Sequence, residues 1–477
     1  MNILIRYLGY ILIISALFRV VPIIAGIIYG ESIFTFVLTM VISFLLGYML
    51  LWFEKKKNPE RSPLSLSQLN LPNALVLVGL SFLILPLISA ISFLPSFHYN
   101  FLNALFESVS GFTTTGLTLY NSTEGLPQSL LLWRAETQWI GGIGIVMIFL
   151  FIISRLRYYG QHEETQIEST SSLYQAQGFQ EKMEPNLKKS SKNVLIIYGG
   201  YTLLGIILLY ITGMNLFEAI SLTFTSISTG GFIVTDTLQA TNVQLGILSV
   251  LMLLGSISFI THNDLLMKRF KSFLKSYEKN LFLVFLLISI GLTLFVFRDV
   301  RVVVFELISA FTTTGYSITN ISVLPPLFLM LIMLGMVTGG SIASTSGGMK
   351  VSRVYSVLKM APWMIKRLSS PRHAIIPLKI RNQVVEQEDL LVIFSFVALF
   401  FMSLFVGILV FLLLGYSLFD SSFQMASALG TVGLQTIDLM AVPVIGKIVL
   451  MLAMLLGRLE IFPLFIILRK LYKTVIR

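Results

Sequence analysis

The sequence predicts an all-α polytopic membrane protein, with two leading helices and then four pseudo-symmetric repeats of span, pore helix, filter loop and span around a central pore. Three observations predict this class. Of the 477 residues, 55% are hydrophobic and only 12% are charged, whereas a soluble domain carries about twice that charge. The apolar residues form runs of about 20, which matches the thickness of a bilayer. A Gly/Thr-rich motif also recurs four times along the chain, which is internal repetition.

Ten apolar segments are long enough to be full spans. They cover 3–30, 32–53, 73–94, 128–154, 193–212, 243–267, 281–297, 326–349, 390–414 and 443–468. The first run is too long for a signal peptide, lacks a small-residue cleavage site and passes almost directly into a second span. The expected organisation is two leading helices over 1–54 and pore repeats over 70–155, 190–268, 280–368 and 386–477.

The net charge of +11 is concentrated in alternate loops. The basic stretches are Lys55–Lys57, 156–192, Lys268–Lys279, Lys350–Arg381 and Arg469–Arg477. Because cytoplasmic loops of membrane proteins are enriched in Lys and Arg, we expect these loops and both termini in the cytoplasm. The charge is therefore a signal of topology in the lipid bilayer, and we expect no nucleic-acid partner. The chain has no cysteine, and its four histidines lie far apart, so neither residue type predicts a metal site.

Four further apolar segments are too short to span. They lie at about 101–115, 216–230, 302–314 and 420–432. A helix of about 13 residues covers only about 20 Å. Each segment lies between two spans on the external side and ends in a Gly/Ser/Thr-rich stretch, which indicates a re-entrant pore helix.

The loops that end these half-helices align without gaps on one glycine each. They read SGFTTTGL (Ser110–Leu117), TSISTGGF (Thr225–Phe232), SAFTTTGY (Ser309–Tyr316) and SALGTVGL (Ser427–Leu434). All four have threonine two positions before the glycine and a hydroxyl residue six before it. The candidate residues for binding K⁺ are Thr114, Thr115, Gly116, Thr229, Gly230, Gly231, Thr313, Thr314, Gly315, Thr431, Val432 and Gly433.

The physics of these loops fits cation coordination. Non-helical backbone inside a membrane is tolerated only where protein buries it or where it lines a wet cavity. Glycine lets successive carbonyls turn toward one axis, a ring of carbonyls can replace the hydration shell of K⁺, and the half-helices point their partly negative ends at the centre. One such motif would favour close helix packing, but four in register favour a filter. We therefore expect channel-like K⁺ uptake, with K⁺ as the transported ligand, Rb⁺ also conducted, and no organic cofactor in this chain.

The repeat continues into the span that follows each loop. Counting 24 and 25 residues past each filter glycine gives Ile140-Gly141, Gly255-Ser256, Gly339-Gly340 and Gly457-Arg458. The fourth copy thus places an arginine at about mid-membrane, where a charge needs a cavity or a partner. The third copy contains TGGSIASTSGG (Thr338–Gly348) and is expected to break its span at the same depth.

We interpret this break as a gating loop below the filter, with Arg458 beside it; the alternative is a flexible helix that only packs against its neighbours. The candidate gating residues are Gly339, Gly340, Ser341, Ser344, Thr345, Gly347, Gly348, Lys350 and Arg458. Two carboxylates, Glu107 and Glu306, lie nine residues before their glycines. They either concentrate cations near the mouth or brace the pore helices, and the sequence leaves both readings open.

These motifs resemble those of the superfamily of K⁺ transporters that comprises the bacterial Trk and Ktr translocating subunits and the plant HKT proteins. The resemblance covers nearly the whole chain and includes WIGGIGI (Trp139–Ile145), GGMK (Gly347–Lys350) and GRLEI (Gly457–Ile461). The length and the two extra leading helices look most like the Trk-type subunit. Some HKT proteins with serine in the first loop favour Na⁺, and Gly116 at that position here argues for K⁺.

The resemblance implies filter glycines in the four loops, an intramembrane gate at Thr338–Gly348 and a gating arginine at Arg458. It also implies a homodimer in the cytoplasmic (inner) membrane of a prokaryote, on a cytosolic nucleotide-binding (TrkA-type) regulatory subunit. The chain has no GxGxxG loop, so such a regulator would be a separate protein.

Two other classes compete with a channel. A secondary transporter coupling K⁺ to Na⁺ or H⁺ would need an anionic site near the midplane, and the sequence offers only Glu460, close to the cytoplasmic end. An intramembrane enzyme would use a serine of GGSIAS, but no positioned base accompanies it. We therefore expect that the protein is not an enzyme.

Overall fold

The computed structural model describes residues 2–57, 71–159, 187–371, 376–380, 383–385 and 387–460, and over them the protein is almost wholly helical. The helices are α1 (Asn2–Phe18), α2 (Val20–Tyr29), α3 (Phe34–Lys57), α4 (Leu71–Phe93), α5 (Phe101–Phe112), α6 (Gln128–Tyr159), α8 (Leu187–Ile211), α9 (Leu216–Ile227), α10 (Asn242–Ser256), α11 (Phe259–Leu266), α12 (Phe270–Leu274), α13 (Tyr277–Leu294), α14 (Val300–Phe311), α15 (Pro326–Thr338), α16 (Val351–Leu368), α17 (Gln387–Leu413), α18 (Leu418–Gly430) and α19 (Val444–Arg458). Two 3₁₀ turns, η2 (Pro95–Phe97) and η3 (Ile321–Val323), and a pair of antiparallel strands, β1 (Lys379–Ile380) and β2 (Gln383–Val384), complete it. Most of the expected basic loop 156–192, the stretch 469–477 and the end of the last span lie outside the described residues.

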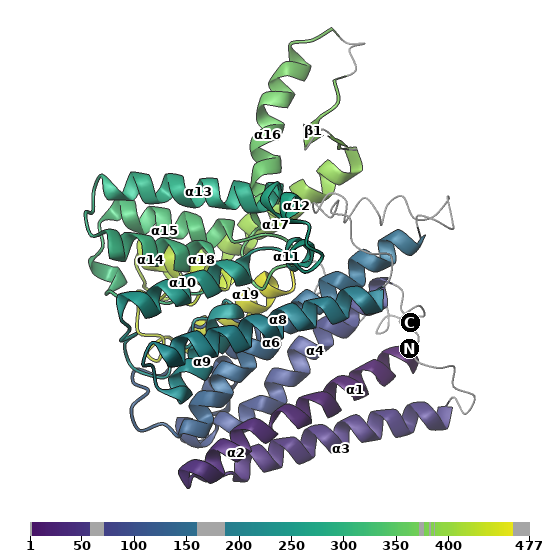
Figure 1. The fold of residues 1–477 in the computed structure, drawn as a ribbon, viewed down its shortest axis with the longest axis vertical. Helices are drawn as coiled ribbons and strands as arrows, with labels where there is room; N and C mark the ends of the chain where they lie inside the picture. The colour runs from purple at the N-terminus through teal and green to yellow at the C-terminus, as the bar shows by residue number, and fades with distance from the viewer. Residues whose placement is uncertain are drawn as a thin grey trace.

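Long helices run side by side across the bundle (Figure 1). Within the described residues, six helical segments are long and apolar enough to cross a membrane, and the bent pair α10–α11 makes a seventh. The outward sides of these helices expose large apolar side chains such as Phe44 and Leu287, while many serine and threonine side chains are buried. An apolar surface around a partly polar interior is the arrangement that lipid contact requires.

The two leading spans pack closely through glycine. A Cβ added to Gly9 of α1 or to Gly47 of α3 would approach the other residue's carbonyl oxygen to 3.0 Å or less, so these backbones lie in contact. The first span is broken at Arg19, between α1 and α2. The Arg19 guanidinium is buried and lies 5.0 Å from the centre of the Trp133 ring, which joins the leading helices to α6.

Four times the chain forms a long helix, a short helix, a loop and a further helix: α4–α5–α6, α8–α9–α10, α13–α14–α15 and α17–α18–α19. The short helices begin and end within a few residues of the expected half-helices. Each begins at a side chain that accepts a hydrogen bond from the first turn, and these caps are Asn100, Asn215, Asp299 and Ser417. All four lie 16 residues before their loop glycine, so the cap belongs to the repeat although the sequence analysis did not single it out.

Two further expected spans are interrupted. The segment 243–267 is bent by 103° between α10 and α11, which the sequence did not predict. The segment 326–349 is helical only to Thr338 and then runs as loop to Lys350, as the glycines predicted. The two breaks hydrogen-bond to each other: Ser341 N donates to Ser256 O (2.9 Å) and Thr345 N donates to Gly255 O (3.0 Å). Because the helix bends here, the carbonyls of Gly255 and Ser256 are available to accept hydrogen bonds from the loop after α15.

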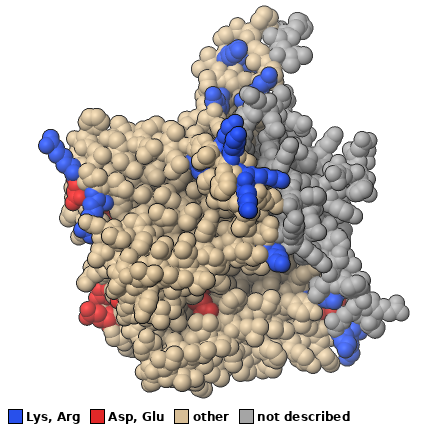
Figure 2. Space-filling view, in the orientation of Figure 1, with Lys and Arg blue, Asp and Glu red and all other residues tan. Residues whose placement is uncertain are grey.

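Beyond the break, α16 projects out of the bundle, with β1 beside it (Figure 1). Lys and Arg side chains lie along this arm (Figure 2), among them the exposed Lys359, Lys366 and Arg367. The buried end of the arm starts immediately after the loop, at Lys350 and Val351. Any displacement of α16 would therefore pull on the loop directly.

Candidate functional site

The four loops share one unusual backbone conformation. The threonine two before each glycine is left-handed, with φ of 51° (Thr114), 52° (Thr229), 59° (Thr313) and 51° (Thr431). The glycines are also at positive φ, with 85° (Gly116), 78° (Gly231), 85° (Gly315) and 99° (Gly433). β-Branched residues rarely adopt this conformation. Alternating positive and negative φ turns successive carbonyls toward one side of the chain, which is the geometry that a ring of oxygen ligands needs.

Each loop is tied back to the end of its own half-helix by the same hydrogen bond. The amide just before the glycine donates to the carbonyl of the hydroxyl residue five positions earlier. The bonds are Thr115 N to Ser110 O (2.9 Å), Gly230 N to Thr225 O (2.8 Å), Thr314 N to Ser309 O (2.9 Å) and Val432 N to Ser427 O (2.9 Å). The negative end of each half-helix dipole therefore lies against its loop.

The loops meet in a closed ring. A Cβ added to Gly116 would come closer than 3.0 Å to Gly230 O in the next loop, and the same holds from Gly231 to Thr314 O. The series continues from Gly315 to Val432 O and from Gly433 back to Thr115 O. Real Cβ atoms do not approach so closely, so only glycine fits at these four positions. The order of loops around the ring follows the order along the chain.

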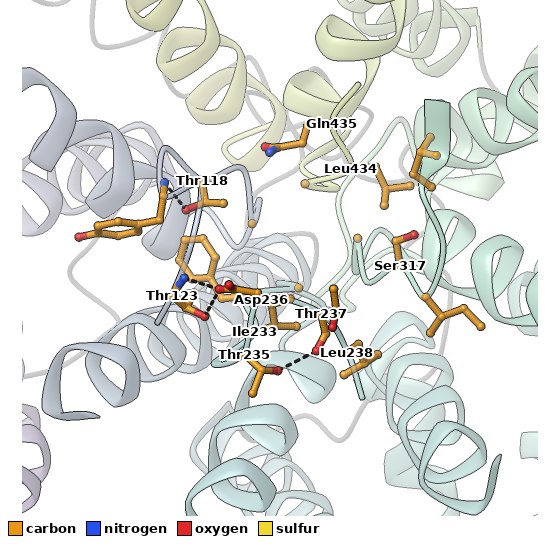
Figure 3. A pocket seen from close by; sticks show the side chains of 18 of the residues that line it. Thr118, Thr123, Ile233, Thr235, Asp236, Thr237, Leu238, Ser317, Leu434 and Gln435 are labelled. Atoms are coloured by element: carbon orange, nitrogen blue, oxygen red, sulfur yellow. Dashed lines mark hydrogen bonds between the residues drawn. The ribbon is translucent and has the colours of Figure 1, made fainter. Parts of the chain in front are cut away.

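A cavity of about 570 Å³ lies on one side of the ring, and all four glycines line it. Figure 3 shows side chains from every loop around this space, including Thr118, Ile233, Ser317 and Gln435. Asp236 lies at its edge and accepts hydrogen bonds from Thr123 N (2.5 Å), Thr123 Oγ1 (2.9 Å) and Ser122 Oγ (2.8 Å). These bonds, with that from the Thr123 amide first, lower the pKa of Asp236, so this side of the ring keeps a negative charge at neutral pH.

The carboxylates nine before the glycines brace the outer part of the loops. Glu107 accepts from Thr118 Oγ1 (2.9 Å) and Leu119 N (3.2 Å) and pairs with Arg134 (2.8 Å). Glu306 accepts from Ser317 Oγ (2.8 Å) and Ile318 N (2.9 Å). Both are fully buried, and neither lines the cavity. Of the two readings left open by the sequence, this geometry favours bracing.

On the other side of the ring, the loop after α15 lies directly against the left-handed threonines. Gly347 N donates to Thr313 Oγ1 (2.7 Å), and Thr229 Oγ1 donates to Thr345 Oγ1 (3.4 Å). A Cβ on Gly347 would collide with Thr431 Oγ1. The segment 339–350 therefore lies directly against the ring at three of its four left-handed threonines.

The other candidate gating residues hold this loop in its compact shape. Gly339 and Gly348 lie against each other's backbone at φ of 65° and 73°, and Gly340 lies against Ser256 O. Ser344 Oγ donates to Ser341 O (2.5 Å). Lys350 Nζ donates to Ser346 O and is buried.

Arg458 lies beside this loop. Its side chain is 2% exposed; Nη1 donates to Thr345 O (2.5 Å) and Nη2 donates to Gly141 O (3.1 Å). A charge in this position needs such carbonyl partners. The arginine thus links α19, the loop after α15 and α6.

Two polar contacts at the site were not expected from the sequence. Arg353 of α16 forms a buried ion pair with Glu460 (2.5 Å), so the carboxylate considered for ion coupling is occupied. Gln138 of α6 is fully buried and bonds to the second loop. Gln138 follows Arg134, Glu136 and Thr137 within an expected span, and this polar cluster is the signal that could have marked it, because polar groups inside a membrane segment need a partner.

The helical bundle, its exposed apolar surface and the closed ring of re-entrant loops define an integral membrane transport protein. A family model described as "TrkH: Cation transport protein" matches residues 32–303 and 294–474. The chain belongs to this TrkH family of cation transport proteins, which confirms both the Trk-type resemblance and the expectation of a transporter rather than an enzyme.

Individual relatives match along nearly their whole length. The chain is 31% identical to an uncharacterized cation transporter of Methanocaldococcus jannaschii, over 99% of this chain and 96% of that protein. It is 26% identical to the Trk system potassium uptake protein TrkH of Escherichia coli, over 97% of each. The crystal structure of the potassium transporter TrkH from Vibrio parahaemolyticus superimposes with a TM-score of 0.85 at 24% identity, over 98% of both chains, which shows the same fold.

Proposed function

We propose that this protein takes up K⁺ across the cytoplasmic membrane through a channel-like filter made by the four loops. The observation that carries the proposal is the closed ring, in which each loop glycine lies against a carbonyl of the next loop. A ring of backbone oxygens can replace the water around K⁺. The names of the relatives as potassium uptake proteins support the choice of ion.

In this proposal the candidate residues of the four loops bind the ion. The glycine carbonyls and those of the residues before them supply ligands, and the left-handed threonines add hydroxyls at the inner end. Thr114 Oγ1 and Thr431 Oγ1 are buried and have no hydrogen-bond partner within the described chain, so they are free to accept an ion. The cavity with Asp236 at its edge would be the external mouth.

The gate in this proposal is the segment 339–350 with Arg458. Three of the four left-handed threonines contact this segment, so an ion leaving the ring meets it next. The fixed charge of Arg458 adds an electrostatic barrier. Opening requires the segment to move away from Arg458, and its glycines permit the change in backbone.

The placement of the external mouth at the cavity puts the opposite side of the protein in the cytoplasm, where a partner would bind. We infer that the basic loops 156–192 and 350–385 and both termini face the cytoplasm of a prokaryote. The projecting, basic α16 would meet a cytosolic nucleotide-binding regulator, which could open the gate by binding the open state more tightly. A homodimer remains part of the proposal through the family alone.

The decisive experiment measures ⁸⁶Rb⁺ flux into liposomes that contain only this protein, with K⁺, Na⁺ and Li⁺ as competitors. We expect K⁺ to compete strongly and Na⁺ and Li⁺ weakly. Equal competition by all three ions would contradict a K⁺ filter. A ²²Na⁺ uptake or a pH change that tracks K⁺ flux would instead support coupled transport.

A further inference from the structure

The second loop is held by a side chain from another repeat. Gln138 of α6 spans Gly231 with its amide: Nε2 donates to Gly230 O (2.6 Å) and Oε1 accepts from Phe232 N (3.1 Å). The opposite orientation of the amide would face donor with donor and acceptor with acceptor. We propose that Gln138 is a selectivity-determining positioning residue that keeps the second loop in its ion-binding shape; this rests on the proposed filter function.

A second contact comes from the same face of α6. Arg134, one turn before Gln138, donates from Nη1 to Ile233 O (3.2 Å) and lies 4.2 Å from the centre of the Phe232 ring. Its guanidinium is fixed in turn by Glu107. Residues four apart on a helix point the same way, so one face of α6 forms hydrogen bonds to the second loop both before and after Phe232.

The second loop needs an external support because it lacks a side chain of its own. In the first and third loops the residue before the glycine is threonine, and its hydroxyl bonds to another threonine two positions earlier, at 2.8 Å in both. The second loop has Gly230 there. A Cβ added to Gly230 would lie closer than 3.0 Å to three atoms of Gln138. Gln138 therefore fills the space that a side chain at position 230 would take.

The support is specific to this repeat. The residues 22 positions after the other three glycines are Leu253, Val337 and Leu455, which cannot form such hydrogen bonds. The held carbonyl, Gly230 O, is also the one against which Gly116 packs. Loss of the Gln138 contacts would therefore loosen the joint between the first and second loops, and a loose ring of carbonyls discriminates less well between K⁺ and Na⁺.

The test replaces Gln138 with methionine, which has nearly the same length but removes both hydrogen bonds. We expect the ratio of K⁺ to Na⁺ flux in proteoliposomes to fall about tenfold, as the loss of a buried hydrogen bond would cause. Leu253→Ala, at the matching position of the next repeat, serves as the control and should keep the wild-type ratio. A purely structural role would lower the protein yield and the total flux of Gln138→Met but leave the ratio unchanged, and that result would overturn the proposal.

A rescue variant makes the test sharper. Gly230 is not at positive φ, so a threonine fits its backbone, and Ser228 lies two positions earlier as a hydroxyl partner. We expect Gln138→Gly, which also removes the Cβ that a side chain at position 230 would meet, to lose selectivity, and Gln138→Gly with Gly230→Thr to regain most of it. No regain in a well-folded double variant would contradict the account of why this loop needs Gln138. If the wild-type protein itself fails to discriminate K⁺ from Na⁺, the filter function fails. If the wild-type protein discriminates and the Gln138 variants discriminate equally well, only the proposed role of Gln138 fails.

Discussion

At the scale of single residues, the four left-handed threonines carry the strain of the site. A non-glycine residue in this region costs about 1–3 kcal/mol and persists only where its surroundings fix it. The repeated bond from the next amide to the half-helix supplies that fixation, for example Thr115 N to Ser110 O and Thr314 N to Ser309 O. The same strained backbone conformation occurs four times in one ring, which indicates that the shape of the loops is required for their function.

The glycines give the most direct prediction at this scale. Gly315→Ser must place a Cβ against Val432 O at a φ of 85°, so the third loop has to withdraw from the fourth. We expect K⁺ over Na⁺ discrimination to fall at least about tenfold, the effect of roughly 1.4 kcal/mol, as measured by competition with ⁸⁶Rb⁺ flux.

Gly246→Ser on α10 is the matched control, because a Cβ at Gly246 meets no atom within 4 Å; it should behave as wild type. Gly116→Ser and Gly433→Ser test the other joints of the ring. Unchanged selectivity in all three loop variants would remove the filter from the proposal.

At the scale of elements, the ends of α16 and α19 next to the loop after α15 carry oppositely charged side chains. Arg353 lies in the first turn of the arm α16, and Glu460 follows Arg458 just after the end of α19. Their buried ion pair therefore connects the arm to the helix that carries the arginine of the proposed gate. The Arg353 guanidinium also lies 4.1 Å from the centre of the Phe396 ring of α17, so three elements meet there.

Removing one partner of this pair should destabilise the protein. Glu460→Gln leaves the Arg353 charge buried without its partner, which typically costs about 3–5 kcal/mol. We expect a clear fall in Tm of the detergent-solubilised protein, and a smaller fall for the double variant Arg353→Met with Glu460→Met. Lys366→Met on the exposed face of the same arm should leave Tm unchanged. An equal fall for the single and double variants would show that the pairing itself does not matter.

The loop and Arg458 are predicted to hold the conduction path closed. Deleting part of Ser341–Gly347, or replacing Arg458 with alanine, removes the contacts between Arg458 and Thr345 O. We expect higher K⁺ flux in both variants at unchanged selectivity, because neither variant changes a residue of the four loops. Arg298→Ala, at an exposed arginine, is the control. Flux at or below wild type in both, at normal protein level, would place the gate elsewhere.

The sequence predicted those elements that depend on local pattern. The half-helices follow from segment length and from the spacing of Gly116, Gly231, Gly315 and Gly433, and the break after Thr338 follows from its glycines. The bend at Ser256 and the contacts of Gln138 could not be predicted, because each depends on backbone groups more than 80 residues away in the chain. Their partners become neighbours only when the repeats assemble.

At the scale of the whole molecule, the direction of the protein in the membrane is open to a clean test, because the chain has no cysteine. We predict that Lys366→Cys on α16 reacts with an impermeant thiol reagent only after the cells are opened. Glu124→Cys, in an exposed turn before α6, should react from outside. Lys189→Cys, whose side chain lies outside the described residues, should behave like Lys366→Cys. Labelling of Lys366→Cys in sealed cells would mean that the orientation is inverted.

The joint between the fourth loop and the first has a consequence for synthesis. Gly433 packs against Thr115 O, and these residues are 433 − 115 = 318 positions apart in the chain. At about 5–20 residues per second, the ribosome needs roughly 15–60 s to make the partner that the first loop lacks. During that time the nascent first repeat holds a strained, polar loop in the bilayer with one side open. Until the fourth loop is made and the ring closes, water, the insertion machinery or the other repeats must therefore supply the polar contacts that the first loop lacks.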